Sequence, residues 1–202
     1  TVEGDPILVD RTGGTLVAWA PAALAVTTSA SGAEYTLTAQ KDAAAQDLIY
    51  QHQSVNAANA GAVAVEMGHA YSKLSFLATA GNGYTGAANL TQVQITGGIY
   101  ATGTLNMVDG KVDPVGTATG TLTLAAGEKA LVIPMAGQPT IAVTCTIDGK
   151  EFTANIKADT MPSLLAGVEY EITLTVVGQE AVISSVKEVP WTTTKVDGGT
   201  IS

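Results

Sequence analysis

Apolar and polar residues alternate with a period of two along much of this chain, which is the pattern of half-buried β-strands. The clearest run follows a glycine turn at Gly167 near the C-terminus. One side of this run carries Tyr170, Ile172, Leu174 and Val176, and the other side carries Glu169, Glu171, Thr173 and Thr175. The alternation predicts an antiparallel strand with one face in the core and one face toward solvent.

The same pattern recurs through the chain between turns rich in Gly, Asp and Asn. It predicts strands over residues 7–9, 15–19, 34–39, 63–67, 74–78, 92–107, 141–147 and 152–156. The last two flank Asp148-Gly149, a dipeptide typical of a two-residue hairpin turn. Only residues 41–50, with their run of alanines, suggest a helical turn, and this turn is too short to set the fold class.

Two positions interrupt the alternation. The apolar residues occupy odd-numbered positions up to Met67 and even-numbered positions from Leu74. We therefore expect a bulge or turn at Gly68. The run over residues 93–107 is longer than a usual strand, so we expect the Gly-Gly pair at 97–98 to bend or divide it.

Short strands at regular spacing, joined by turns, favour an all-β fold built of β-sandwiches. The stretch from Asp109 to Gly120 is low in hydrophobicity and rich in glycine, so it is the best candidate for a domain boundary. We therefore expect an N-terminal domain over residues 1–110 and a C-terminal domain over residues 111–202.

Composition places the chain among folded acidic proteins. Apolar residues make up 46% and charged residues 13% of the chain, a balance that argues against disorder. The net charge is −9, Arg11 is the only arginine and the eight lysines are scattered, so the basic cluster that nucleic-acid binding requires is missing. No apolar run reaches the roughly 20 residues of a membrane-spanning helix.

No sequence pattern predicts a catalytic, metal or cofactor site. His52 and His69 lie in different segments without a second ligand at zinc spacing, so we expect an exposed loop residue and a structural residue, respectively. Three aspartates in glycine-bearing turns are expected to bond the local backbone rather than calcium. They are Asp109, Asp113 and Asp148. Cys145 is the only cysteine and shares a face with apolar residues, so we expect a buried thiol and no internal disulfide.

Four segments of the chain, taken in order, match the motifs of one known family. They are Asp47-Leu48-Ile49-Tyr50, His69-Ala70-Tyr71-Ser72-Lys73-Leu74, Ala130-Leu131-Val132-Ile133-Pro134-Met135, and the run from Leu164 to Trp191. Together they resemble the fimbrillins, the type V pilus subunits of Gram-negative anaerobes. The resemblance implies two tandem antiparallel β-sandwich domains with transthyretin-like or Greek-key connectivity.

The resemblance also implies export as a lipoprotein precursor through the periplasm and outer membrane, with a lipid anchor on the precursor only. Other pilin subunits would be the partners, joined by strand exchange after an Arg- or Lys-specific protease removes an N-terminal segment. Arg11, beside flexible glycines, is the candidate cleavage site. Asp159-Thr160-Met161 resembles an O-glycosylation acceptor, which makes Thr160 a candidate modification site. The stretch before Asp47 is shorter than in typical members, so first strands of the fold could be missing.

The sequence thus predicts a structural subunit of cell-surface fimbriae that contributes to adhesion, with no catalytic residues and no cofactor. One alternative is a non-polymerising surface lipoprotein or tip adhesin that binds host or bacterial glycans through an exposed aromatic platform. A second alternative is a hydrolase, for which two carboxylates converging in a deep cleft would be the sign. Trp191, after Pro190, could stack on a sugar, but we expect it to plug the edge of the second sandwich.

Overall fold

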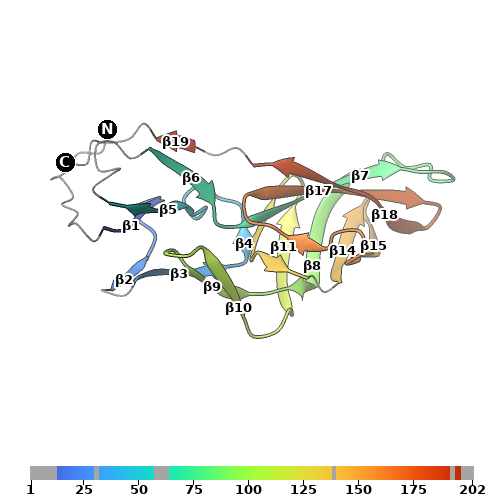
Figure 1. Cartoon of the computed structure of the whole chain (residues 1–202). Helices are drawn as coiled ribbons and strands as arrows, with labels where there is room; N and C mark the ends of the chain where they lie inside the picture. The colour runs from blue at the N-terminus through green and yellow to red at the C-terminus, as the bar shows by residue number, and fades with distance from the viewer. Residues whose placement is uncertain (1–12, 30–31, 57–63, 138–139, 192–193, 197–202) are drawn as a thin grey trace.

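The fold is built from β-strands alone. The computed structural model describes residues 13–29, 32–56, 64–137, 140–191 and 194–196. Nineteen strands and no helix occur in these residues, which confirms the predicted all-β class. The strands form an elongated molecule in which the sheets gather into two groups along the long axis (Figure 1).

Two four-stranded sheets, the ones that contain β1 (Gly14–Ala20) and β2 (Thr27–Ser29), face each other at one end of the molecule (Figure 1). In spatial order, the first sheet contains β1 (Gly14–Ala20), β5 (Ile49–Val55), β6 (Val65–His69) and β19 (Thr194–Val196). The second contains β10 (Lys111–Val115), β9 (Thr102–Asn106), β3 (Gly32–Thr38) and β2 (Thr27–Ser29). A hydrophobic cluster that includes Leu37, Leu105 and Tyr71 fills the space between them, and we call it the first core.

The other two large sheets form the second sandwich. One contains β11 (Gly120–Ala125), β8 (Leu90–Ile99), β14 (Ile141–Ile147) and β15 (Lys150–Ile156). Its partner contains β18 (Glu180–Pro190), β17 (Val168–Val177), β7 (Ser72–Ala80), β12 (Ala130–Val132) and β4 (Gln40–Lys41). The larger hydrophobic cluster, the second core, lies between them. A small sheet pairs β13 (Met135–Ala136) with β16 (Ser163–Leu164).

β12 lies between the two cores and joins them. Ala130 and Val132 pack in the second core, while Leu131 and Ile133 pack in the first. All four side chains are fully buried. Because both faces of this strand are covered, neither set of alternate residues needs to be polar. This explains why the segment is a continuous apolar run in the sequence.

The division into separately folding domains at residue 110 stays a prediction. Hydrogen bonding between strands crosses this point in both directions. β7 and β8 precede it, yet they pair with β17 and β14, which follow it. β10 follows it, yet it pairs with β9. The low-hydrophobicity stretch around residues 109–120 therefore contains strand β10 and the connection from the first sandwich to β11.

The two strongest strand predictions are confirmed. β17 buries Tyr170, Ile172, Leu174 and Val176 completely. β14 and β15 form the predicted hairpin, with Ile147 opposite Lys150 and positive φ angles at Asp148 (48°) and Gly149 (74°). One pairing departs from the predicted antiparallel pattern, because β7 and β17 are parallel. The Greek-key or transthyretin-like connectivity stays a prediction.

Other local predictions need correction. The change of parity after Met67 does not arise at Gly68, because the chain leaves β6 and enters β7 of another sheet through the buried residues Ala70 and Tyr71. The 92–107 run bends at the Gly-Gly pair, where the register of β8 shifts, but it divides at residues 100–101. The predicted turn at 41–50 is present as a single turn, in which the N–H groups of Gln46 and Asp47 both bond to the Ala43 carbonyl, and no helix continues from it. The expected strand at 7–9 lies outside the described residues.

The hairpin turn of β14 and β15 also holds the loop between β7 and β8. The Asp148 carboxylate accepts hydrogen bonds from the Tyr84 hydroxyl at 2.6 Å and from the backbone N–H groups of Ala88 and Asn89, both at 2.9 Å. The hydrogen bond from Tyr84, followed by those of the backbone, lowers the pKa of Asp148. The predicted backbone-bonding role of this aspartate is confirmed, although its partners come from a distant loop.

We expect Asp148→Asn to destabilise the protein at neutral pH, with a difference from wild type that shrinks below about pH 4. A carboxylate whose pKa is lowered by folding stabilises the folded state above its unfolded pKa, and this contribution is lost as the pH falls through the lower, folded pKa. Asparagine tolerates the left-handed backbone of this position, so the substitution tests the charge. Urea unfolding between pH 3 and 7 measures the effect, and a difference that does not change with pH would contradict it.

Candidate functional site

The first sandwich is open along one side. β1 is the last strand of its sheet and β2 is the last strand of the facing sheet, so both sheets end on the same side among the described residues. A groove of about 440 Å³ runs between them. Its lining residues are Thr15, Val17, Trp19, Thr28, Ser29, Gly32, Ala33 and Val108.

One wall of this groove consists of alternate residues of β1. Thr15, Val17 and Trp19 face the groove, while Leu16 and Ala18 face the opposite side of the sheet. Val17 and Trp19 pack against the first core but remain partly exposed. The first core is therefore incomplete at this edge, and an extended segment placed beside β1 would both continue the sheet and cover apolar surface.

The opposite wall is narrow and made of small residues. β2 has only three residues, and Gly32 and Ala33 begin β3 beside it. Small side chains leave room for another chain to approach the sheet closely. The groove is therefore shaped for a strand, with one apolar wall and one wall of small side chains and hydroxyls.

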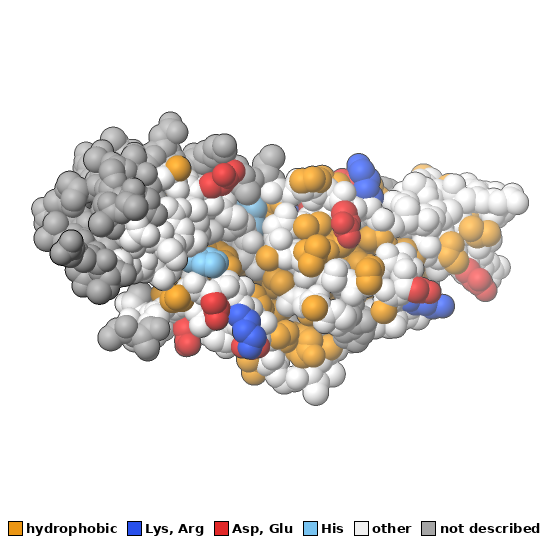
Figure 2. Space-filling view, in the orientation of Figure 1, with side chains coloured by type: hydrophobic (Ala, Val, Ile, Leu, Met, Phe, Trp, Pro, Cys, Tyr) orange, Lys and Arg blue, Asp and Glu red, His pale blue; other side chains and the backbone are white. Residues whose placement is uncertain are grey.

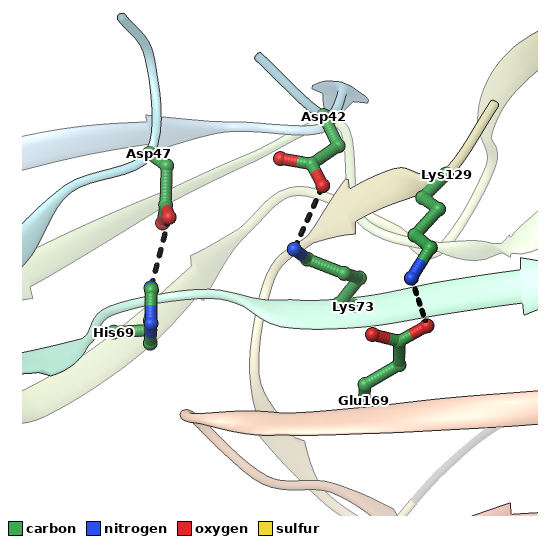
Figure 3. Close-up of polar contacts among 6 residues, drawn as sticks. All are labelled: Asp42, Asp47, His69, Lys73, Lys129 and Glu169. Atoms are coloured by element: carbon green, nitrogen blue, oxygen red, sulfur yellow. Dashed lines mark hydrogen bonds and ion pairs between the residues drawn. The ribbon is translucent and has the colours of Figure 1, made fainter. Parts of the chain in front are cut away.

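A layer of paired charges lies where the two sandwiches meet (Figure 3). Lys73 Nζ lies 2.7 Å from Asp42 Oδ2, and the Lys73 side chain is only 10% exposed. Lys129 Nζ lies 2.7 Å from Glu169 Oε1. Burial alone would raise the pKa of Glu169, but hydrogen bonds from Lys129 and Ser75 outweigh it and lower that pKa.

Trp191 fastens the end of β18 to this layer. Its indole stacks on the His69 ring, with 3.6 Å between ring centroids and 12° between planes. Lys73 Nζ lies 3.6 Å from the centre of the indole, within cation–π range. His69 Nδ1 lies 2.8 Å from Asp47 Oδ2 (Figure 3). Trp191 was expected at the edge of the second sandwich. It instead packs against the first core, and so connects the end of β18 in the second sandwich to the first sandwich.

The residues predicted from the sequence are spread over the molecule. Arg11 lies outside the described residues, so its role as a cleavage site stays a prediction. Thr160 lies in an exposed turn after β15, and its candidacy for O-glycosylation also stays a prediction. His52 is exposed as expected, but it lies in β5 rather than in a loop, where it stacks on Tyr50. His69 has the structural position that was expected of it.

Chemically reactive groupings are sparse in the part of the chain that the structure describes. Cys145 is buried in the second core, and burial raises the pKa of its thiol to about 11. Within the described ranges, no three His, Cys, Asp or Glu side chains gather as metal ligands would. None of the described residues forms a helix long and apolar enough to cross a bilayer.

A family of known proteins accounts for this combination of sandwiches and motifs. The model of the family described as fimbrillin-like matches residues 5–191. The chain belongs to the fimbrillin-like family. Among curated proteins, none matches this fimbrillin-like chain at a significant level.

Solved structures agree with the fold of this fimbrillin-like protein. A candidate cell adhesion protein of Bacteroides uniformis is similar with a TM-score of 0.68 and 23% identity, over 89% of this chain and 73% of that one. Another from Bacteroides ovatus is similar with a TM-score of 0.64 and 20% identity, over 95% of this chain and 74% of that one. At these identities the likeness supports the fold.

Sequence reasoning missed most of the charged layer. Lys73 and Glu169 occupy polar positions of their strands, yet they are only 8% and 9% exposed as whole residues. Lys73 is covered by Asp42 and the Trp191 ring, and Glu169 is paired with Lys129, so their burial depends on distant parts of the chain. The one available signal was the lysine in the motif from His69 to Leu74, which the resemblance singled out without giving a physical reason.

Proposed function

We propose that this fimbrillin-like protein is a structural subunit of cell-surface fimbriae that assembles by strand exchange and contributes to adhesion. Family membership supports the fimbrial role. The two similar structures are candidate cell adhesion proteins, which supports a place at the cell surface. The proposal includes no enzymatic activity and no cofactor.

The observation that carries the proposal is the groove between β1 and β2. Val17 and Trp19 are apolar, pack against the first core and remain partly exposed along a sheet edge. A strand from a neighbouring subunit would pair with β1 and bury these side chains, gaining about 25 cal/mol for each Å² of apolar surface removed from water.

The proposed partners are other pilin subunits, as copies of this chain or related chains. In this scheme the precursor carries a lipid anchor and crosses the periplasm and outer membrane before a protease cuts at Arg11. Cleavage after Arg11 would release the segment that directly precedes β1, so the cut would act next to the groove. Modification at Thr160 would fall on an exposed turn of the second sandwich, away from the groove.

The glycan-binding lipoprotein remains the second candidate function. An exposed aromatic platform, on a protein without a strand-accepting groove, would indicate this function. Trp19 lies within the groove, and Trp191 is held between His69 and Lys73, so neither forms such a platform. The groove therefore favours the polymerising subunit.

Treatment of the purified protein with an Arg-specific protease tests the proposal, because the chain has a single arginine. We expect heat-sensitive ladders on gels and filaments in negative-stain micrographs after the cut. An Arg11→Ala variant, treated in the same way, should stay monomeric. A clean cut that leaves the wild-type protein monomeric would remove Arg11 as the trigger and shift the assignment to a tip, anchor or glycan-binding role.

A further inference from the structure

A second open cleft lies in the second sandwich, away from the strand-accepting groove. It occupies about 580 Å³ between the edge strand β15 and the turn that joins β17 to β18. Its lining residues are Thr144, Glu151, Phe152, Thr153, Gln179, Glu180 and Ala181. Most of them are polar, and nothing in the proposed assembly uses them.

This cleft continues onto the outer face of the sheet formed by β11, β8, β14 and β15. Thr123, Gln94, Thr144 and Thr153 are aligned partners that form one row across all four strands. The next row is Ala125, Gln92, Thr146 and Glu151. These side chains are exposed or half-exposed, and Glu151 is the only charged member of the two rows. On a protein with a net charge of −9, this face is nearly neutral.

The side-chain types of these rows exclude several partners. Nucleic acids and anionic lipid surfaces require clusters of Lys and Arg, which the two rows lack. The centres of protein–protein interfaces are rich in aromatic residues, Met and Arg, and the rows contain none of these. On the face of the molecule shown in Figure 2, charged side chains are few and scattered.

Hydroxyl and amide groups both donate and accept hydrogen bonds. A regular array of Thr and Gln therefore matches a ligand that itself bears many neutral hydroxyl groups. The adjoining cleft adds two carboxylates, Glu151 and Glu180, which can only accept hydrogen bonds when ionised. Ala181 adds a small apolar contact within the same cleft, while the Phe152 side chain packs into the second core beneath it.

We propose that this cleft, with the rows of Thr and Gln beside it, binds a neutral polysaccharide. Thr144 and Thr153 belong both to the row and to the cleft, so they are the central contacts. The carboxylates accept hydrogen bonds from sugar hydroxyls at one end, and the sheet face supports the continuing chain. The site lies outside the first sandwich, so this binding does not depend on strand exchange.

Native gels cast with a dissolved polysaccharide test the proposal with the full chain. The neutral probes are yeast mannan, barley β-glucan and dextran, and polygalacturonate is the acidic comparator. We expect at least one neutral probe to slow the protein, and a Thr144→Ala/Thr153→Ala variant to weaken this binding by about tenfold, since it removes two hydrogen-bonding side chains. Thr79→Ala, an exposed threonine on the other large sheet, should bind like wild type.

Three results would overturn the proposal. They are migration unchanged by every neutral probe, retardation by polygalacturonate alone, and retardation that persists in the double variant at wild-type strength. Release of reducing ends from a bound probe would instead assign a hydrolase that uses Glu151 and Glu180. Circular dichroism and thermal unfolding of the double variant, compared with wild type, separate lost binding from lost folding.

Discussion

Val17→Asp is expected to abolish assembly of the protease-treated protein while leaving the monomer folded. Val17 lies in the wall of the groove, and an incoming strand would bury it. An aspartate there would lose its water without gaining a partner, which costs several kcal/mol for each buried ion. In the unassembled subunit Val17 is already partly exposed, so the free protein tolerates the charge far better. Ladders on gels and negative-stain micrographs measure the result.

Ala18→Asp is the matched control for this prediction. Ala18 is the next residue of the same strand, is also partly exposed, and faces away from the groove. The Ala18→Asp protein should assemble like wild type. Mixing the Val17→Asp protein with wild type provides a second readout. The variant subunits should donate a strand but accept none, and so they should shorten the ladders. Equal assembly by the two variants would place the strand-accepting site elsewhere.

Lys73→Ala is expected to lower the free energy of unfolding by about 3 kcal/mol, the lower end of the range for breaking a buried ion pair. The substitution removes the 2.7 Å ion pair with Asp42 and the contact with the Trp191 ring. It leaves the Asp42 carboxylate, 24% exposed, without its cation. Denaturant unfolding measures the loss, and Trp191 fluorescence reports whether the end of β18 loosens.

Lys111→Ala provides the comparison for an exposed pair. Lys111 and Asp113 form an ion pair with side chains 66% and 65% exposed, and removal of such a solvent-screened pair is expected to change stability little. An Asp42→Asn variant and the double variant with Lys73→Ala complete a thermodynamic cycle that isolates the coupling between the two groups. The prediction fails if Lys73→Ala destabilises the protein no more than Lys111→Ala does.

The elements most accurately predicted are those defined by local sequence. β17 follows from the alternation of apolar and polar residues between Glu169 and Val176, because a strand points successive side chains to opposite faces. The β14–β15 hairpin follows from Asp148-Gly149, because this turn needs two residues that adopt positive φ. In both cases the signal and the structure lie within a few residues of each other.

Elements that depend on distant contacts were predicted less well. The parallel pairing of β7 with β17 joins segments nearly a hundred residues apart, and alternation alone does not say which strands are neighbours. The parity change after Met67 was assigned to a local bulge at Gly68, whereas the chain passes from one sheet to another. A bulge and a change of sheet leave the same trace in the sequence, because each shifts the period by one residue.

The candidate site shows the same division. Family motifs pointed to strand exchange, but the groove itself became visible only when β1 and β2 were found at the open ends of two facing sheets. Trp191 was expected to plug the edge of the second sandwich, and its actual partners His69 and Lys73 could not be inferred from spacing. Exposed hydroxyl rows arise in the same way, since a row crosses four strands that the sequence keeps apart.

The sequence by itself determined the all-β class, the main strands and the family. These properties follow from residue periodicity, turn chemistry and composition, which act over short stretches of chain. Only the tertiary structure decided where the sheets end, why β12 is apolar on both faces, and which charges are buried between the sandwiches. Each of these depends on which distant surface covers a residue, because burial is a property of the packed chain and not of local sequence.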